Sequence, residues 1–238
     1  MTKPTTEIFI DAAQLASHTA EWIAGLIAAK PGRFRIALTG GTTPRGLYRQ
    51  LGMRFHDAVD WTQVEFFWGD ERFVPHNSPD SNYRMTRETL LTQIPALAKN
   101  IHPIAGEGDP QKSAQDYETA LKQAYGSDLL DPAQPLFDLV LLGLGADGHI
   151  CSLLPGSPAL DEKQRWVVAV TEGRPETRIT LTYPPIQSSR TTAFLVSGRE
   201  KARAVDAVRA GDQSLPGARL RPEGELVWLM DRAAAGLA

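Results

Sequence analysis

Cysteine is almost absent from this chain: Cys151 is the single one among 238 residues. No internal disulfide can form, which favours a reducing compartment, and we therefore expect a cytoplasmic protein. Cys151 is most simply a small buried hydrophobe. The opening segment MTKPTTEIFI has no charged region followed by a long apolar run, so no signal peptide is expected. No apolar run approaches the ~20 residues of a membrane span, so we expect no membrane association.

An excess of positive charge is also missing. The 25 Lys and Arg residues face 28 Asp and Glu residues, which leaves a formal net charge of −3. Because such a chain has no basic field for a nucleic-acid backbone, we expect no nucleic-acid partner and assign any anion to a local site. The five histidines show no metal-ligand spacing such as H-E-x-x-H, so we expect no metal.

What the chain does contain is an alternation of strand-like and helix-like segments. Strands are predicted at 6–10, 33–38, 64–68, 100–104, 137–142, 166–170, 178–182, 193–198 and 225–230. Helices are predicted at 12–30, from Pro44 onward, from the end of the 69–82 loop to about Ile94, and at 110–125, 185–190 and 199–210, with a short helical turn after His149. This order predicts an α/β fold, a doubly wound, mostly parallel sheet with helices on both faces. With no repeat or low-complexity linker, residues 1–238 are expected to form a single domain.

Three loops at predicted carboxyl ends of strands carry unusual chemistry: TGGTTP, GDER and GLGADGH. Ligands of such sheets bind beyond these strand ends, so we expect the loops to converge. In TGGTTP, Gly40 and Gly41 allow close backbone approach, and amides up to Thr43 with the Thr42 and Thr43 hydroxyls suit a phosphate at a helix N-terminus. The alternative is a tight turn capped by Thr43.

The GDER loop places Asp70 and Arg72 together after a very apolar strand. Arg72 suits a bidentate contact to a phosphate or a substrate oxygen. Asp70 suits a hydrogen bond to a substrate hydroxyl or a role in proton transfer. The alternative is a solvated charge cluster with an internal ion pair.

The GLGADGH loop carries Asp147 and His149, a carboxylate two positions from an imidazole. Histidine is the usual general base near neutral pH, and a carboxylate can orient it. Amides from Gly145 to Gly148 could face a developing oxyanion. The structural alternative is that His149 caps a short helix and Asp147 forms an Asx-turn.

The same loop also matches the dinucleotide-binding pattern G-x-G-x-x-G through Gly143, Gly145 and Gly148. Glu172 could then serve as the ribose-binding acid. Prolines at 155 and 158, however, cut short the long helix that this motif needs, and Asp147 would place a like charge beside a pyrophosphate. We therefore favour the catalytic interpretation and expect no nicotinamide or flavin cofactor.

Taken together, the loops resemble the 6-phosphogluconolactonase family. The resemblance is carried in order along nearly the whole chain by residues 37–48, 66–85, 137–157, 178–186, 195–205 and 215–235. It implies a Rossmann-like, doubly wound α/β fold related to glucosamine-6-phosphate deaminases and isomerases, and lactone hydrolysis without a metal or nicotinamide. Thr39 and Thr42 stand where the family more often has serine, and the chain reads DGHICS where the family reads DGHTAS.

The resulting hypothesis is hydrolysis of 6-phospho-D-glucono-1,5-lactone to 6-phosphogluconate. His149 would activate water, and Asp147 would orient the His149 imidazole. Asp70 would contact the sugar or complete the proton network. The phosphate would be held by Gly40, Gly41, Thr42, Thr43, Arg72 and Arg178, the last from the resemblance at RITLT. A deaminase or isomerase of amino-sugar phosphates and a non-catalytic sugar-phosphate sensor are the alternatives. We expect a small-molecule substrate and a monomer or weak homo-oligomer.

Overall fold

The computed structural model describes residues 4–237, and its centre is a six-stranded, wholly parallel sheet. The strand order is β1-β9-β8-β5-β2-β3. The strands are β1 (Thr5–Phe9), β2 (Phe34–Leu38), β3 (Val64–Trp68), β5 (Phe137–Leu142), β8 (Ser189–Val196) and β9 (Glu225–Asp231). Every residue of β3 and β5 is buried, which is the pattern of strands covered on both faces. This confirms the predicted doubly wound α/β class.

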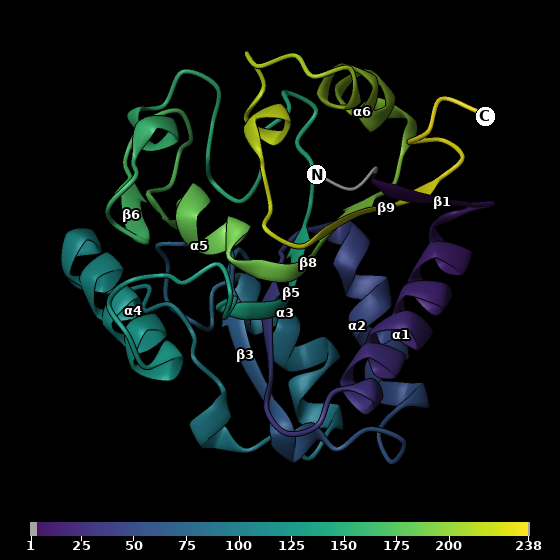
Figure 1. Cartoon of the computed structure of the whole chain (residues 1–238), viewed down its shortest axis with the longest axis horizontal. Coiled ribbons are helices and arrows are strands. Elements are labelled where there is room, and N and C mark those ends of the chain that lie inside the picture. The colour runs from purple at the N-terminus through teal and green to yellow at the C-terminus, as the bar shows by residue number, and fades with distance from the viewer. Residues whose placement is uncertain (1–3, 238) are drawn as a thin grey trace.

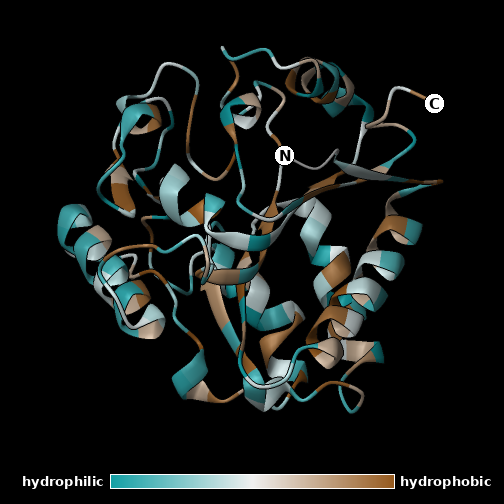
Figure 2. Ribbon diagram, in the orientation of Figure 1, coloured by the Kyte–Doolittle hydropathy of each residue, from teal (hydrophilic) through white to brown (hydrophobic). Residues whose placement is uncertain are grey.

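Helices cover both faces of this sheet (Figure 1). Helices α1 (Ala12–Ala29), α2 (Thr42–Arg54) and α3 (Asn82–Thr89) lie on one side. Helices α4 (Pro110–Tyr125), α5 (Tyr183–Gln187) and α6 (Ala202–Arg209) lie on the other. Figure 2 shows hydrophobic residues concentrated on the sheet and on the inner sides of the helices. No helix within residues 4–237 has the length and hydropathy needed to cross a bilayer.

Local signals explain where two of these helices begin. The Asp11 side chain accepts a hydrogen bond from the Gln14 amide at the start of α1. Asp109 caps α4 in the same way, Pro110 occupies its first turn, and Gly126 ends it in the left-handed conformation. These helix ends agree with the prediction because each depends on residues within one turn of it.

The chain reverses direction across the sheet at β2, which lies between β3 and β5. From β2 the chain passes through α2 to β3, and β5 later returns to the opposite side of β2. The loops that follow β2 and β5 therefore diverge and leave a crevice at the carboxyl end of the sheet. That crevice lies between TGGTTP and GLGADGH.

A second sheet, which the sequence analysis did not separate from the first, supplies the rest of the site. It is antiparallel, with the order β4-β7-β6, and consists of β4 (Asp70–Arg72), β7 (Arg178–Leu181) and β6 (Val167–Val170). The prediction of GDER as a loop was therefore wrong. The strand predictions at 166–170 and 178–182 were right in type, but these strands join a different sheet. Apolar periodicity identifies a strand without naming its neighbour.

Other boundaries also differ from prediction. The segment predicted as a strand at 100–104 forms only an isolated bridge between Ile101 and Phe66. Helix α3 ends at Thr89, before a separate 3₁₀ turn, and not near Ile94. Residues 189–190, predicted as the end of a helix, open strand β8. After His149 a turn closed by an Ile150–Leu153 bridge replaces the expected helical turn.

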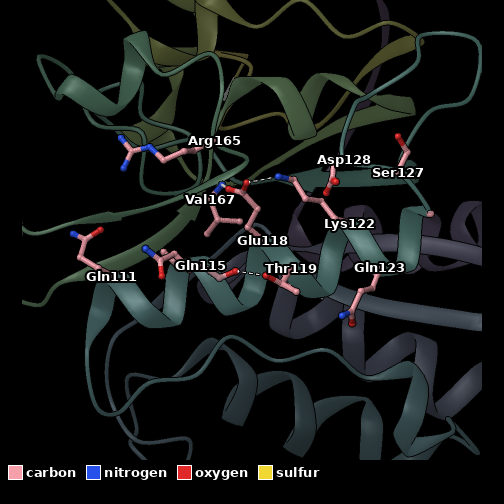
Figure 3. Close-up of a pocket in the computed structure, with 12 residues that line it drawn as sticks. Gln111, Gln115, Glu118, Thr119, Lys122, Gln123, Ser127, Asp128, Arg165 and Val167 are labelled. Atoms are coloured by element: carbon pink, nitrogen blue, oxygen red, sulfur yellow. Dashed lines mark hydrogen bonds and ion pairs between the residues drawn. The ribbon is translucent and has the colours of Figure 1, made fainter.

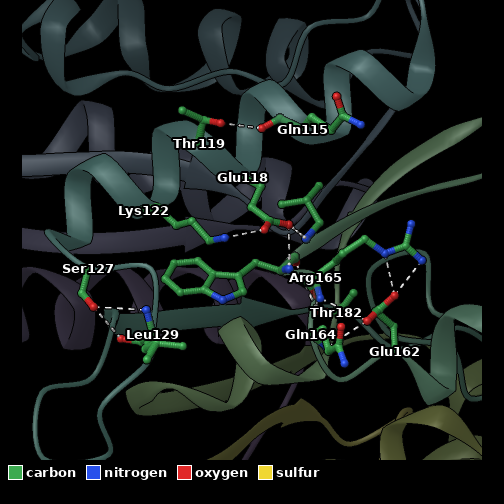
Figure 4. A network of polar contacts seen from close by, with 12 residues as sticks. Gln115, Glu118, Thr119, Lys122, Ser127, Leu129, Glu162, Gln164, Arg165 and Thr182 are labelled. Carbon is green, nitrogen blue, oxygen red and sulfur yellow. Dashed lines mark hydrogen bonds and ion pairs between the residues drawn. The ribbon is translucent and has the colours of Figure 1, made fainter.

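Helix α4 holds the second sheet in place through one carboxylate. Glu118 Oε2 accepts hydrogen bonds from the backbone amides of Trp166 at 2.8 Å and Val167 at 3.2 Å (Figure 4). Lys122 pairs with Glu118 Oε1 at 2.7 Å and lies over the Trp166 ring. A cleft of about 550 Å³ lies beside this network and is shown in Figure 3. Three of its four charged lining side chains, Glu118, Lys122 and Arg165, are engaged in ion pairs, and Asp128 is the fourth.

Replacing Glu118 with alanine is expected to lower the free energy of unfolding by about 1–3 kcal/mol, because two buried amides at the start of β6 lose their acceptor. Urea denaturation of both proteins measures this. Gln115→Ala is the matched control, since Gln115 lies on the same helix and lines the same cleft but is exposed. Equal losses in the two variants would contradict the role of Glu118.

Candidate active site

The three loops meet at a cleft of about 270 Å³ at the carboxyl end of the central sheet. Every sequence-predicted site residue except Asp147 lines it: Gly40, Gly41, Thr42, Thr43, Asp70, Arg72, His149 and Arg178. Asp147 lies just behind, in contact with the His149 ring. The cleft is thus built at the ends of β2, β5 and β8 of the parallel sheet and by β4 and β7 of the antiparallel sheet.

The TGGTTP loop presents an uncapped helix end. Helix α2 begins at Thr42, its N-cap is Gly41 with φ +102°, and no side chain caps it. The prediction of Thr43 as the cap was therefore wrong, since Thr43 lies inside the first turn. The amides that a cap would satisfy remain available at the cleft, and the helix dipole favours an anion there.

Gly40 is required by a close neighbour. A Cβ at this position would lie 1.9 Å from Oδ1 of Asn82. Asn82 opens helix α3, and its side-chain amide donates to the backbone carbonyl of Asp70 at 3.0 Å. Gly40 thereby lets the TGGTTP loop pack directly against the segment that links the strand carrying Asp70 and Arg72 to α3.

Two arginines face each other across the antiparallel sheet. Arg72 on β4 and Arg178 on β7 are direct cross-strand partners. Each has a buried Nε atom without a hydrogen-bond partner in the described part of the chain, and both side chains line the cleft. Burial, followed by the charge of Arg72, lowers the pKa of Arg178. Like charges at opposed positions destabilise a sheet. Arg178 Nη2 pairs with Glu176 at 3.2 Å, so the buried Nε atoms of the two arginines are the donors left without an acceptor within the described residues.

The position of Arg72 is set by its neighbour Glu71, which is 1% exposed. The Glu71 carboxylate accepts bonds from the amides of Arg72, Asn82 and Tyr83 and from the Ser81 hydroxyl. Burial raises the pKa of Glu71 by more than these donors lower it, so the pKa lies above its usual value. The carboxylate joins β4 to the start of α3 and is a structural part of the GDER segment.

Asp70 is 8% exposed and is held on one side. The Ser152 hydroxyl donates to Asp70 Oδ2 at 2.6 Å. Ser152 follows the GLGADGH loop, so this bond joins the second sheet to the loop that carries His149. Asp70 also lines the cleft, where a substrate hydroxyl could reach it.

His149 and Asp147 form a hydrogen-bonded pair. Nδ1 of His149 lies 2.5 Å from Asp147 Oδ1, and we assign the proton to Nδ1 because a carboxylate only accepts. Nε2 then carries the lone pair. Burial raises the pKa of Asp147, but the bonds from His149 and Arg174 outweigh it and leave that pKa at about 2. Asp147 is thus ionised at neutral pH, as an orienting partner must be.

The glycines of this loop serve the histidine. A Cβ on Gly145 would lie 2.0 Å from His149 Nδ1, and Gly148 has φ +77°. The Gly145 amide donates to the His149 carbonyl, and the Gly148 amide donates to the Gly145 carbonyl. These two amides are therefore engaged within the loop. The prediction that the amides from Gly145 to Gly148 face an oxyanion was wrong for Gly145 and Gly148.

Several cleft residues escaped the sequence analysis. Asn82 and Lys201 line the cleft, and Ser152 and Arg174 contact its carboxylates. Asn82, Ser152 and Lys201 lie in motifs that carry the family resemblance, whereas Arg174 lies outside all of them. Cys151, expected to be buried, is partly exposed and has the strained φ of 49°. Burial raises the pKa of its thiol well above the usual value, so it is a poor nucleophile.

Replacing Gly145 with alanine is expected to displace the His149 ring, because the new methyl group would lie 2.0 Å from Nδ1. For any reaction in which His149 acts as a base, a small misplacement of this kind lowers kcat about 10²-fold. Steady-state kinetics measure the loss, and the imidazole NMR signal of His149 reports the displacement. Gly143→Ala is the structural control, since its Cβ would find its nearest neighbour at 3.5 Å. An unmoved imidazole signal in Gly145→Ala would contradict this account.

The parallel sheet, with a cleft lined by Arg72, Arg178 and Lys201 at its reversal point, defines a doubly wound α/β protein. The model of the family described as glucosamine-6-phosphate isomerases/6-phosphogluconolactonase matches residues 10–228. The chain belongs to this family, which confirms the resemblance drawn from its motifs.

Individual relatives agree with that assignment. A Synechocystis protein named 6-phosphogluconolactonase is 41% identical over 211 residues, covering 87% of this chain and 85% of its own. The solved structure of 6-phosphogluconolactonase from Trypanosoma brucei superimposes with a TM-score of 0.81 at 30% identity, covering both chains completely. A monomeric glucosamine-6-phosphate deaminase shares the fold, with a TM-score of 0.84 at 24% identity over 98% of this chain and 100% of its own.

Proposed function

We propose that this chain hydrolyses 6-phospho-D-glucono-1,5-lactone to 6-phosphogluconate, the lactonase step of the oxidative pentose phosphate pathway. The observation that carries the proposal is the opposed pair Arg72 and Arg178, whose buried Nε atoms have no partner among residues 4–237, in the same cleft as His149. The names of relatives such as the Synechocystis protein support the substrate.

The phosphate end of the substrate lies, in this proposal, between the two arginines and the uncapped start of α2. Arginine is suited to this because its planar fork matches phosphate oxygens. Gly40 to Thr43 contribute amides and hydroxyls at the helix N-terminus. An anion held in this way offsets the repulsion between Arg72 and Arg178.

The reacting carbonyl lies, in the same proposal, beside Nε2 of His149. Nε2 removes a proton from water as the water oxygen bonds to the lactone carbonyl carbon. Asp147 supports the imidazolium that forms. The bond between that carbon and the ring oxygen then breaks, and the imidazolium returns the proton to the ring oxygen. The product is the open-chain acid, and His149 is neutral again.

The negative charge on the carbonyl oxygen needs donors other than the amides of Gly145 and Gly148, which are engaged in the loop. Positive side chains that line the cleft, Lys201 among them, can offset it. Asp70, with one oxygen held by Ser152, is assigned to a sugar hydroxyl or to the proton network.

We also propose that the chain acts as a single lactonase domain, as a monomer or weak homo-oligomer, in the cytoplasm. A main hydrophobic core with members from Phe9 to Ala234, beside one small separate cluster of Leu154, Val168 and Val170 among the described residues, supports the single domain. The lone cysteine supports a reducing compartment. Sedimentation at increasing protein concentration measures the oligomeric state.

A coupled assay tests the activity. Glucose-6-phosphate dehydrogenase supplies fresh lactone, and the disappearance of the lactone is compared with its spontaneous hydrolysis. We expect a rate proportional to the amount of added protein. A rate equal to the spontaneous one would overturn the proposal. Release of ammonia from glucosamine 6-phosphate would favour a deaminase, and tight binding without turnover would favour a sensor.

A further inference from the structure

Arg174 contacts both members of the Asp147–His149 pair. It belongs to the loop between β6 and β7, and its Nη2 atom is 2.8 Å from Asp147 Oδ2 and 3.3 Å from His149 Nδ1. Arg174 is not among the residues that line the cleft. Any influence it has on the reaction therefore passes through Asp147 and His149.

The Nδ1 atom of His149 has two competing partners. If Nδ1 donates to Asp147, Nε2 is unprotonated and can act as a base. If Nδ1 accepts from Arg174, the neutral ring carries its proton on Nε2 and cannot. The distances of 2.5 Å to the carboxylate and 3.3 Å to the guanidinium favour the first arrangement.

Arg174 itself stabilises that arrangement. It binds Oδ2 of Asp147 while Nδ1 of His149 binds Oδ1, so the carboxylate is held at both oxygens. The Asp147 side chain is 41% exposed, so little packing holds it in place. Without Arg174 its carboxylate could rotate away from His149. A carboxylate held at one oxygen orients the imidazole less well.

We propose that Arg174 is a positioning residue that holds the Asp147 carboxylate against Nδ1 of His149 and so selects the imidazole tautomer whose Nε2 is free. The structural part of this inference stands on the contacts alone. Its consequence for turnover rests on the proposed lactonase function, in which His149 is the base.

The tautomer is measured by ¹⁵N NMR of the histidine ring in the whole protein, at a pH where the imidazole is neutral. We expect mainly the Nδ1–H form in the unaltered protein. Arg174→Gln should shift the population toward the Nε2–H form. Arg174→Lys should keep most of the Nδ1–H population, because lysine can still pair with Asp147. An unchanged population in Arg174→Gln would overturn the proposal. Arg165→Gln is the control, since Arg165 is also exposed and also pairs with a carboxylate, Glu162.

A double-mutant cycle separates positioning from direct contact. Arg174→Gln should lower kcat about tenfold with KM unchanged, within the range found for residues in contact. In an Asp147→Ala background the same substitution should cost nothing further, because Arg174 acts through Asp147. Additive losses, or a rise in KM alone, would place Arg174 on the substrate and overturn the proposal. Absence of lactone hydrolysis by the unaltered protein would instead reject the proposed function, while the tautomer measurement would still test Arg174.

Discussion

Replacing His149 with asparagine is expected to lower kcat by about 10²–10⁴-fold, the usual contribution of a general base. Asparagine has no atom at the position of Nε2 that can take a proton from water. KM should change little, because the phosphate contacts of Arg72, Arg178 and the start of α2 are untouched. Steady-state kinetics with freshly generated lactone measure both constants.

The chain offers a matched control for this substitution. His56 also pairs with a neighbouring aspartate, with Nδ1 2.6 Å from Asp57 Oδ1, but it lies on the surface outside the cleft. His56→Asn should leave both kcat and KM as they were. Near-normal turnover in His149→Asn would remove His149 from the role of base, however well the loop is formed.

Replacing Arg178 with glutamine is expected to raise KM roughly 30-fold or more, since losing one partner of a buried charged contact costs ~2–5 kcal/mol. The Arg178 side chain is only 14% exposed, and its Nε has no partner within the described residues. If its contact is equally strong in the ground and transition states, kcat should stay nearly unchanged. Arg72→Ala should act in the same direction. Arg190→Gln is the control, because Arg190 is exposed and pairs with Asp138 on the central sheet.

Thermal unfolding gives an independent view of the same arginine. Inorganic phosphate should raise the Tm of the unaltered protein, because a ligand bound only to the folded state stabilises it. Arg178→Gln should lose most of that response with little change in the Tm measured in the absence of phosphate, since it removes both a like-charge contact with Arg72 and an ion pair with Glu176. A phosphate response in Arg178→Gln equal to that of the unaltered protein would contradict this role. In the kinetic experiment, a fall in kcat of Arg178→Gln with KM unchanged would place Arg178 at the reacting carbonyl.

Much of the scaffold is predictable from residues close together in the sequence. The caps at Asp11 and Asp109 and the buried run 137–142 are local signals. The meeting of TGGTTP, GDER and GLGADGH also follows from a general rule, since all three follow buried strands of one parallel sheet. A Cβ at Gly145 would collide with His149, so this glycine of the GLGADGH loop is explained by the histidine without a bound dinucleotide.

The remaining features depend on contacts between distant segments. Gly40 meets Asn82, Asp70 meets Ser152, and Arg72 faces Arg178 only because β4 and β7 pair in one particular register. Arg174 reaches Asp147 from a loop whose position depends on the second sheet. No periodicity or spacing encodes these meetings, which explains why Arg174 and Ser152 were missed.

The sequence alone determined the α/β class, the family resemblance and the residue types that carry the chemistry, because periodicity, caps and motifs are local properties of the chain. Tertiary structure alone decided that α2 is uncapped at the cleft, that two arginines with buried Nε atoms are opposed there, and that Asp147 is held by both His149 and Arg174. Those facts depend on strand partners and register, and strand pairing joins residues about a hundred positions apart, as Arg72 and Arg178 are.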